Sequence, residues 1–392
     1  MDRRHFLNMA LGAACSAAAM PLVTPMSFAA TQGDKRFVAI VLRGAMDGLD
    51  VVQPYGDPLL RKLRKTISVG PEKGALDLDG FYALHPALAP LMPMWQAGEL
   101  GFAQAVSTPY RDKRSHFVGQ DILEAGTTGD SVPDDINSGW LNRLLPMLPG
   151  ATMETAFAVG IENMTILSGD AAHASWAPQA KLSVTPQAQN LLHIMYENDP
   201  PFQNASDVAI ALSAASRTGD AMKGSEKRQL AGSLASFAAG RLNADTRIAA
   251  FSLTGWDSHH RQQGSLMRAL EQLAEALTVL KQELGANWGQ TVVMAMTEFG
   301  RTVRENGTNG TDHGTGGLMI MAGGAIRGGR VYGDWPGLDE ADLYAGRDLM
   351  PTADVRAYAG AALSGLFGVS TAAVESTIFP GLIMPDPPKL LL

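Results

Sequence analysis

Three short runs of apolar residues show no alternation with polar residues, and an acidic residue follows each run within a few positions. The runs are Phe37–Leu42, Ile248–Leu253 and Thr291–Met296. A strand that is apolar on both sides has to be covered on both faces, which is the usual situation in the parallel sheet of an α/β protein. We therefore predict an α/β fold with parallel strands at the centre of its sheet.

Amphipathic helical segments alternate with strands along most of the chain. Further strands are predicted at Gly101–Val106 and Gly316–Met321, and helices at His85–Gln96, Ser115–Glu124, Gln262–Leu284 and Asp354–Leu366. Between residues 126 and 245 the pattern is less regular and turn residues are frequent, although Thr155–Val159 has the composition of a strand. We predict that residues 126–245 are a cap or insertion in a single domain that spans residues 30–392.

The first 29 residues have the features of an export signal. Arg3 and Arg4 precede an apolar, alanine-rich stretch, and Ser27 and Ala29 are small residues at the positions that a signal peptidase reads. The arginine pair is typical of a twin-arginine signal. Prolines interrupt the apolar run, so it is too short to act as a permanent membrane anchor. We expect the twin-arginine translocase to be a partner during export, and the mature protein to be periplasmic or secreted.

Composition excludes several other classes of protein. Acidic residues outnumber basic ones by 39 to 31, whereas binding to a nucleic acid backbone usually requires a basic surplus. We therefore expect no nucleic acid partner. Cys15 is the single cysteine and lies within the predicted signal, so the mature chain has no disulfide, no thiol nucleophile and no cysteine ligand for a metal.

Acidic residues and histidines gather after the predicted strands. They are Asp47 after the first run, Asp257 and His259 after the second, Glu298 after the third, and Asp312 and His313 in a glycine-dense turn. Loops from several parallel strands converge beyond their carboxyl ends. Carboxylate oxygens and imidazole nitrogens are natural ligands for a divalent cation. These six residues are therefore the predicted metal site.

Each of these positions also has a purely structural interpretation. Asp257 is in place to cap the following helix, which would leave His259 and His260 on the helix surface. Glu298 and Arg301 are spaced to form a buried ion pair that orders their loop. The glycine-dense turn that follows is compatible with the tip of a hairpin.

A second group of residues is a candidate for catalysis. Ser115 begins a predicted helix, where free amides and the helix dipole favour an anion or a developing alkoxide. Capping is also the ordinary role of a serine at that position. We take Ser115 as the candidate nucleophile and His116 as its neighbour in the site. Arg301 is the candidate to bind an anionic oxygen, and Glu298 is a candidate proton shuttle as well as a ligand.

Five motifs together resemble a known family. They are Arg43-Gly44-Ala45-Met46-Asp47-Gly48-Leu49, Arg114-Ser115-His116-Phe117, Asp257-Ser258-His259, Thr297-Glu298-Phe299-Gly300-Arg301 and Thr311-Asp312-His313-Gly314. They look like the motifs of the twin-arginine-exported family catalogued as domain of unknown function 1501, within the alkaline-phosphatase-like superfamily of phosphatases and sulfatases. The resemblance spans nearly the whole mature chain. It implies an α/β fold with a doubly wound, mostly parallel sheet that carries helices on both faces.

The resemblance also implies roles for individual residues. Asp47 matches the first metal-binding aspartate of the superfamily, and Ser115 matches its nucleophile. Asp257 and His259 match an aspartate–histidine pair, and His313 matches a late histidine ligand. One or two divalent ions are implied, with zinc or manganese favoured over calcium or magnesium because histidines are present.

This chain departs from the superfamily pattern at one motif. Where phosphatases carry Asp-His-Gly, it has Glu298-Phe299-Gly300 and so lacks one histidine, which Asp312 and His313 are expected to replace in part. The expected activity is hydrolysis of a small anionic phosphate or sulfate ester, with Ser115 or a metal-bound water as nucleophile. The alternative is a non-catalytic periplasmic binding or assembly factor that retains the fold.

Overall fold

The strands predicted at the three apolar runs lie side by side in the middle of one sheet. The computed structural model describes residues 34–67, 69–160, 164–176, 226–384 and 386–392. Strand β1 (Arg36–Arg43) pairs in parallel with β8 (Ile248–Thr254) on one side and with β9 (Thr291–Met296) on the other. The carboxyl ends of these three strands therefore share one edge of the sheet.

The sheet contains nine strands in the described part of the chain, in the order β11-β5-β10-β9-β1-β8-β6-β7, with β12 paired to β5. The remaining strands are β5 (Leu100–Ser107), β6 (Ala156–Val159), β7 (Ala174–Trp176), β10 (Gly317–Ala322), β11 (Arg330–Tyr332) and β12 (Ala353–Asp354). Strand β10 runs antiparallel to β5 and β9, and every other pairing is parallel. The predicted α/β fold with a mostly parallel sheet is confirmed.

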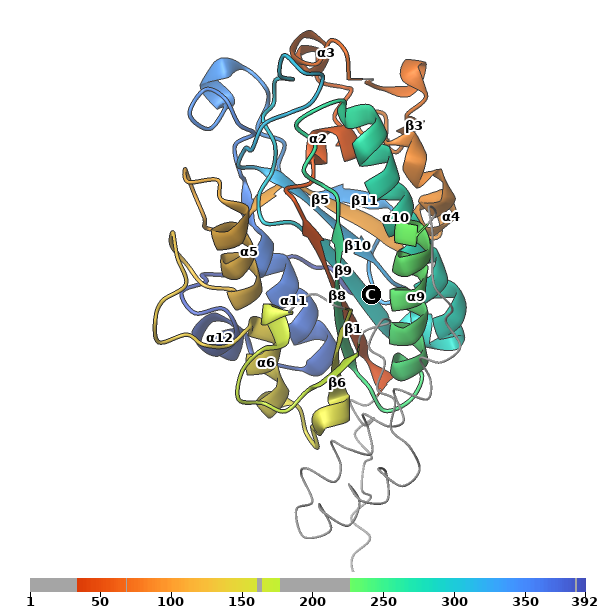
Figure 1. Ribbon diagram of the computed structural model, residues 1–392, viewed down its shortest axis with the longest axis vertical. Helices are drawn as coiled ribbons and strands as arrows, with labels where there is room; N and C mark the ends of the chain where they lie inside the picture. Colours follow the sequence, from red (N-terminus) through yellow and green to blue (C-terminus); the bar gives the residue numbers. More distant parts are fainter. Residues whose placement is uncertain (1–33, 68, 161–163, 177–225, 385) are drawn as a thin grey trace, which may run out of the picture. The chain divides into compact units, whose positions relative to one another are not determined.

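Helices cover both faces of this sheet (Figure 1). One face carries the 3-10 helix η3 (Pro86–Leu91) and the helices α4 (Met92–Gln96), α9 (Glu226–Leu242) and α10 (Gln262–Leu284). The opposite face carries α5 (His116–Ala125), α6 (Trp140–Leu144), α11 (Val355–Phe367) and α12 (Thr371–Ala373). The sheet is therefore doubly wound, with helices packed on both of its faces.

Shorter elements complete the described part of the chain. A small antiparallel sheet is formed by β2 (Val52–Gln53), β4 (Ala83–Leu84) and β3 (Leu76–Asp77), next to the helices α2 (Gly48–Val51) and α3 (Pro58–Leu63). Single turns occur at η2 (Pro71–Lys73), η4 (Leu145–Met147), η5 (Met153–Thr155), η6 (Thr165–Leu167), η8 (Gly285–Gln290), η9 (Glu340–Asp342) and η10 (Val374–Ile378).

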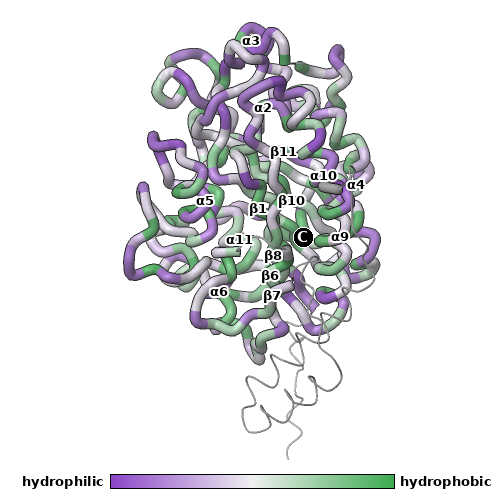
Figure 2. The backbone as a smooth tube through the Cα atoms, viewed as in Figure 1, coloured by the Kyte–Doolittle hydropathy of each residue, from purple (hydrophilic) through white to green (hydrophobic). Residues whose placement is uncertain are grey.

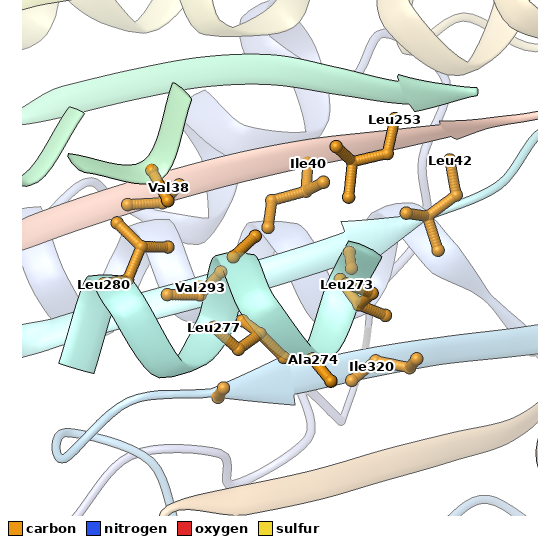
Figure 3. Packing of buried hydrophobic residues seen from close by; sticks show 14 of the residues in the cluster. Val38, Ile40, Leu42, Leu253, Leu273, Ala274, Leu277, Leu280, Val293 and Ile320 are labelled. Carbon is orange, nitrogen blue, oxygen red and sulfur yellow. The ribbon is translucent and has the colours of Figure 1, made fainter. Parts of the chain in front are cut away.

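Strand β1 explains why its sequence shows no polar alternation. Val38, Ile40 and Leu42 point into the core beneath α10, whereas Phe37 and Val41 point into the core on the opposite face. Successive side chains of a strand lie on opposite faces, so a strand covered on both sides needs apolar residues throughout. Figure 3 shows Val38 and Ile40 beside the residues that α10 contributes, among them Leu273, Leu277 and Leu280.

Hydropathy along the chain follows the same layering. Figure 2 shows hydrophobic colours along the central strands and the helices that lie against them, and hydrophilic colours in many of the peripheral turns around α3. The apolar sequence pattern is therefore used mainly to bury the sheet.

One predicted helix differs from the observed structure. The segment His85–Gln96 forms η3 and then the short helix α4, instead of one continuous α-helix. Pro90 lies inside η3 and Pro93 lies in the first turn of α4. Proline has no N–H to donate and clashes with the preceding turn, so the α-helical hydrogen-bond pattern cannot run through both positions.

One further prediction, the cap at residues 126–245, falls in part on described residues. Within residues 126–245, β6 and β7 extend the main sheet and α9 packs against α10. Residues 177–225, which hold the rest of the predicted cap, lie outside the described residues, as does the predicted export signal of residues 1–29. Among the helices that the structure describes, none combines the length and apolar character needed to cross a membrane.

We predict that Leu277→Ala lowers the free energy of unfolding by about 2–5 kcal/mol, because it removes a fully buried side chain between α10 and the sheet and leaves a cavity. Urea unfolding measures the change. Thr278→Ala, at the exposed neighbouring position, is the control and is expected to alter stability by less than about 0.5 kcal/mol. Equal effects of the two variants would contradict the packing described here.

Candidate metal centre

Four side chains from three separate segments converge beyond the carboxyl edge of the sheet. His116 is the first residue of α5, Asp257 and His259 follow β8, and His313 precedes β10. Donor atoms of His116, Asp257 and His313 all lie within 4.8 Å of one another. His259 joins them, because its Nε2 is 3.1 Å from Asp257 Oδ1 and 2.9 Å from His313 Nε2. Sites of this kind depend on loops that the sheet edge holds together.

Each of the three histidines directs its Nε2 inward because its Nδ1 has a partner outside. His116 Nδ1 is 2.8 Å from Glu298 Oε1, and His259 Nδ1 is 3.1 Å from Asp312 Oδ1. His313 Nδ1 is 2.9 Å from the carbonyl oxygen of Arg114, which can only accept a hydrogen bond. These partners place the ring proton on Nδ1 and leave a lone pair on Nε2, as in the carboxylate–histidine–metal arrangement.

The three histidine Nε2 atoms that point into the cluster are better suited to binding a cation than to contacting one another. With both Nδ1 atoms protonated, the Nε2 lone pairs of His259 and His313 face each other at 2.9 Å. Two nitrogens bound at about 2.0 Å in a tetrahedral zinc site are about 3.3 Å apart. The Nε2 atom of His116 is buried without a hydrogen-bond partner, 3.5 Å from Asp257 Oδ2. A divalent cation would satisfy all three nitrogens together.

The pKa values of His313 and Asp257 favour ligand-competent protonation states. Burial lowers the pKa of His313, so its ring stays neutral at neutral pH. Burial alone would raise the pKa of Asp257, but the hydrogen bond and charge of Arg301 lower it below its usual value and keep the carboxylate ionised. The hydrogen bond to Glu298 raises the pKa of His116 and so acts in the opposite direction: it favours the protonated ring, whose proton a bound cation would have to displace.

Arg301 lies behind Asp257 and is wholly buried. Its guanidinium donates to the carbonyl oxygens of Gly44, Ala45 and Thr311 and, at 2.5 Å, to Asp257 Oδ1. The sequence analysis proposed that Arg301 binds an anionic oxygen of the substrate. The structure instead turns its described donors toward protein acceptors, so that Arg301 anchors Asp257 and leaves Asp257 Oδ2 facing His116.

Glu298 is also fully buried, and both of its oxygens are occupied. Oε1 accepts from the amide of Gly44, from His116 Nδ1 and from Gln120 Nε2, and Oε2 accepts from Thr297. Burial alone would raise the pKa of Glu298, but the hydrogen bonds from His116 and Gln120 lower it. Glu298 therefore lies in the layer that orients His116, behind the position predicted for it as a ligand.

Asp312 has a similar orienting position on the other side. Its Oδ1 accepts from His259 Nδ1 and from Asn306 Nδ2, and the hydrogen bond from Asn306 lowers its pKa. Of the predicted Asp312–His313 pair, only His313 directs a donor into the cluster. His260, at the neighbouring loop position, is exposed and lies outside the cluster.

Asp47 lies in a separate buried network. Both of its oxygens pair with Arg64, at 2.8 and 2.9 Å, and Oδ2 also accepts from Gln262. Asp50 shares Gln262 with it, and burial together with the charge of Asp47 raises the pKa of Asp50 to about 6. The structure thus gives Asp47 an arginine partner, which the sequence analysis did not foresee because Arg64 is 17 positions away in a polar segment.

Ser115 occupies the N-cap position of α5 and is half-buried. Its side chain makes no capping hydrogen bond, and its amide donates to the hydroxyl of Tyr110. The two turn residues Asp112 and Arg114 have positive φ values of 66° and 49°, and such strain is common where a loop presents functional groups. The hydroxyl directly before His116 is therefore not used to cap the helix.

His116 is the residue whose role the sequence analysis placed least well. The sequence predicts it as a catalytic neighbour of Ser115, whereas the structure groups it with Asp257 and His313 as a candidate ligand. Its signal was present in the sequence, since a histidine opens the helix that follows a buried strand. The partner that turns its Nε2 inward, Glu298, lies 182 positions away, so only the fold could reveal the pairing.

The family prediction is confirmed by comparison with known proteins. The sequence model described as "Protein of unknown function (DUF1501)" matches residues 90–378. This chain belongs to that family. Among curated proteins, none has a matching sequence.

Comparison with solved structures gives matches at low sequence identity, one of them described as a protein of the alkaline phosphatase superfamily. A protein of that superfamily from Vibrio parahaemolyticus is 12% identical with a TM-score of 0.38, over 86% of this chain and 67% of that chain. Lipooligosaccharide phosphoethanolamine transferase A from Neisseria meningitidis is 12% identical with a TM-score of 0.40, over 85% of this chain and 55% of that chain. The zinc complex of the C-terminal periplasmic domain of EptC from Escherichia coli is 10% identical with a TM-score of 0.38, over 74% of this chain and 73% of that chain.

We predict that Asp312→Ala weakens zinc binding by about 10- to 100-fold, because His259 loses the acceptor that fixes its ring. Asp312 is half exposed, so the fold is expected to be retained. Calorimetric titration of the metal-free protein with zinc measures the affinity. Asp339→Ala removes an exposed carboxylate elsewhere and is the control. Unchanged affinity in Asp312→Ala would argue that His259 is not a ligand.

Proposed function

We propose that this protein is a metal-dependent hydrolase of phosphate or sulfate esters that works with one divalent cation. The observation that carries the proposal is the convergence of the Nε2 atoms of His116, His259 and His313 on the carboxylate of Asp257. Three nitrogens and one oxygen, without sulfur, are a donor set that suits zinc, with manganese next.

Two buried arginines support a single ion over a pair. The carboxylate of Asp47, expected to serve as a further ligand, is neutralised by Arg64, and Oδ1 of Asp257 is neutralised by Arg301. A second divalent ion would have to displace guanidinium groups that are themselves fully buried. Because a buried charge without its partner is costly, we infer that the arginines replace a second cation.

The bound cation would act as a Lewis acid on the ester and would lower the pKa of a hydroxyl or a water beside it. The protein residues supply position and charge. Ser115 lies at the N-terminus of α5, where the helix dipole favours a developing alkoxide. Glu298 holds His116 in place, and Arg301 holds Asp257. Attack by water or by the Ser115 hydroxyl forms a new bond to phosphorus or sulfur while the bond to the alcohol oxygen breaks, and the proton given up by the nucleophile ends on that oxygen. Where Ser115 attacks, water then hydrolyses the seryl ester, which frees phosphate or sulfate and restores the serine hydroxyl.

We predict one zinc or manganese ion per chain in protein purified without chelators, and metal-dependent hydrolysis of a phosphate or sulfate ester. Elemental mass spectrometry and an assay with 4-nitrophenyl phosphate and 4-nitrophenyl sulfate test both parts. His313→Ala is expected to lose the ion and at least about 100-fold in kcat/KM. His260→Ala, the exposed neighbour of His259, is the matched control and should retain both.

Ser115→Ala assigns the nucleophile in the same assay. If the serine attacks, kcat falls by roughly 100-fold or more while the metal is retained. A loss below about threefold would assign the attack to water. A bound ion without turnover of either ester would contradict the hydrolase proposal and favour a non-catalytic binding or assembly factor.

We also propose that the protein is exported through the twin-arginine pathway, on the strength of Arg3 and Arg4 before the apolar stretch. Replacing both by lysine keeps the charge and is expected to retain the precursor in the cytoplasm. Fractionation and immunoblotting measure the distribution. Replacing Arg268 and Arg304, two exposed arginines beyond the predicted cleavage site, by lysine is the control. Export of the Arg3→Lys, Arg4→Lys variant at the normal level would contradict the proposal.

A further inference from the structure

Two arginines flank the candidate metal centre and share one buried carboxylate. Asp348 is fully buried, and its Oδ2 is 2.8 Å from Arg114 Nη2 while its Oδ1 is 2.9 Å from Arg347 Nη1. Thr315 donates a third hydrogen bond to Oδ2. Asp348 therefore fixes the two guanidinium groups, which come from segments more than 200 positions apart in the sequence.

Both arginines form hydrogen bonds with His313. The carbonyl oxygen of Arg114 accepts from His313 Nδ1, and Arg347 Nη1 donates to the carbonyl oxygen of His313 at 3.0 Å. The arginine pair is therefore positioned by the same contacts that position a candidate metal ligand. The hydrogen bonds to His313 therefore fix how far the arginine pair lies from an ester bound at the metal centre.

The pair retains hydrogen-bonding capacity that the described protein residues do not use. The side chains of Arg114 and Arg347 are 26% and 41% exposed. Arg347 makes its described hydrogen bonds through Nη1 alone, whereas Arg114 already donates from Nη2 to Asp348 and from Nη1 to the carbonyl oxygen of Asp112 and contributes mainly its charge. The nearby carboxylate of Asp312 is already held by His259 and Asn306. Fixed, partly solvated guanidinium groups with free N–H donors are suited to bidentate binding of an oxyanion.

We infer that Arg114 and Arg347 form a subsite for a second anionic group, so that the substrate is an ester whose alcohol part carries a carboxylate, phosphate or sulfate of its own. This inference rests on the proposed function, because the metal centre binds the ester group. The positive φ of Arg114 supports it, since the turn holds this arginine in a conformation that is uncommon for a residue other than glycine.

The test compares binding of three non-hydrolysable probes to the zinc-loaded protein by calorimetry: phenylphosphonate, 3-carboxyphenylphosphonate and 4-carboxyphenylphosphonate. We expect at least one carboxylated probe to bind roughly fivefold more tightly than phenylphosphonate, the gain typical of a partly exposed ion pair. In Arg347→Met this preference should fall to about one, and Arg347→Lys should keep part of it because the charge remains.

Two controls separate a subsite from general effects of charge and folding. Arg304→Met removes an exposed arginine from a neighbouring loop and should leave the preference unchanged. As the second control, each preference is the ratio of two affinities measured on the same zinc-loaded variant, so that an effect of Arg347→Met on zinc binding or on phenylphosphonate itself cancels from the ratio. A preference near one in the unaltered protein, or one that survives Arg347→Met, overturns the subsite and leaves the hydrolase proposal standing. Failure of all three phosphonates to bind overturns both.

Discussion

The buried guanidinium of Arg301 is the interaction on which the rest of the site depends. It joins the loop after β1, through Gly44 and Ala45, to Asp257 after β8 and to Thr311 before β10. The guanidinium itself is wholly buried, and a buried charge that loses its acceptors is costly, so these loops are strongly held together. Gly44 has φ +123°, and a Cβ atom there would lie 2.6 Å from the amide nitrogen of Asp257. Only glycine permits this close approach of the two loops.

Around that anchor the site has two layers with different tasks. The inner layer directs three imidazole nitrogens and one carboxylate toward a common point, and the outer layer supplies an acceptor for each imidazole: Glu298, Asp312 and the carbonyl of Arg114. Outer partners of this kind fix ring orientation and tautomer. A carboxylate whose oxygens already accept hydrogen bonds is a poor metal ligand. The presence of an acidic residue in a loop therefore does not show to which of the two layers it belongs.

Much of the fold could be predicted because each strand and helix carries its own pattern. The predicted bounds of Thr291–Met296 and Gln262–Leu284 are those observed for β9 and α10. Apolar runs identify strands covered on both faces, and a period of 3.6 residues identifies the helices that cover them. The segment His85–Gln96 was less predictable, since its two prolines allow helical turns but no continuous α-helix. The order of strands, with antiparallel β10 between β5 and β9, depends on contacts that local patterns do not record.

The sequence by itself determined the family, the type of sheet and the loops in which acidic residues and histidines gather, because these follow from local composition and from motifs. Tertiary structure alone decided which of those side chains meet. Asp47 and Glu298 share the local context of Asp257, yet Asp47 is paired with Arg64 and Glu298 is bound to His116, whereas Asp257 faces the histidines. The difference lies in partners far away in the sequence, and the direction of a side chain at a strand end is set by the hydrogen bonds that those partners offer.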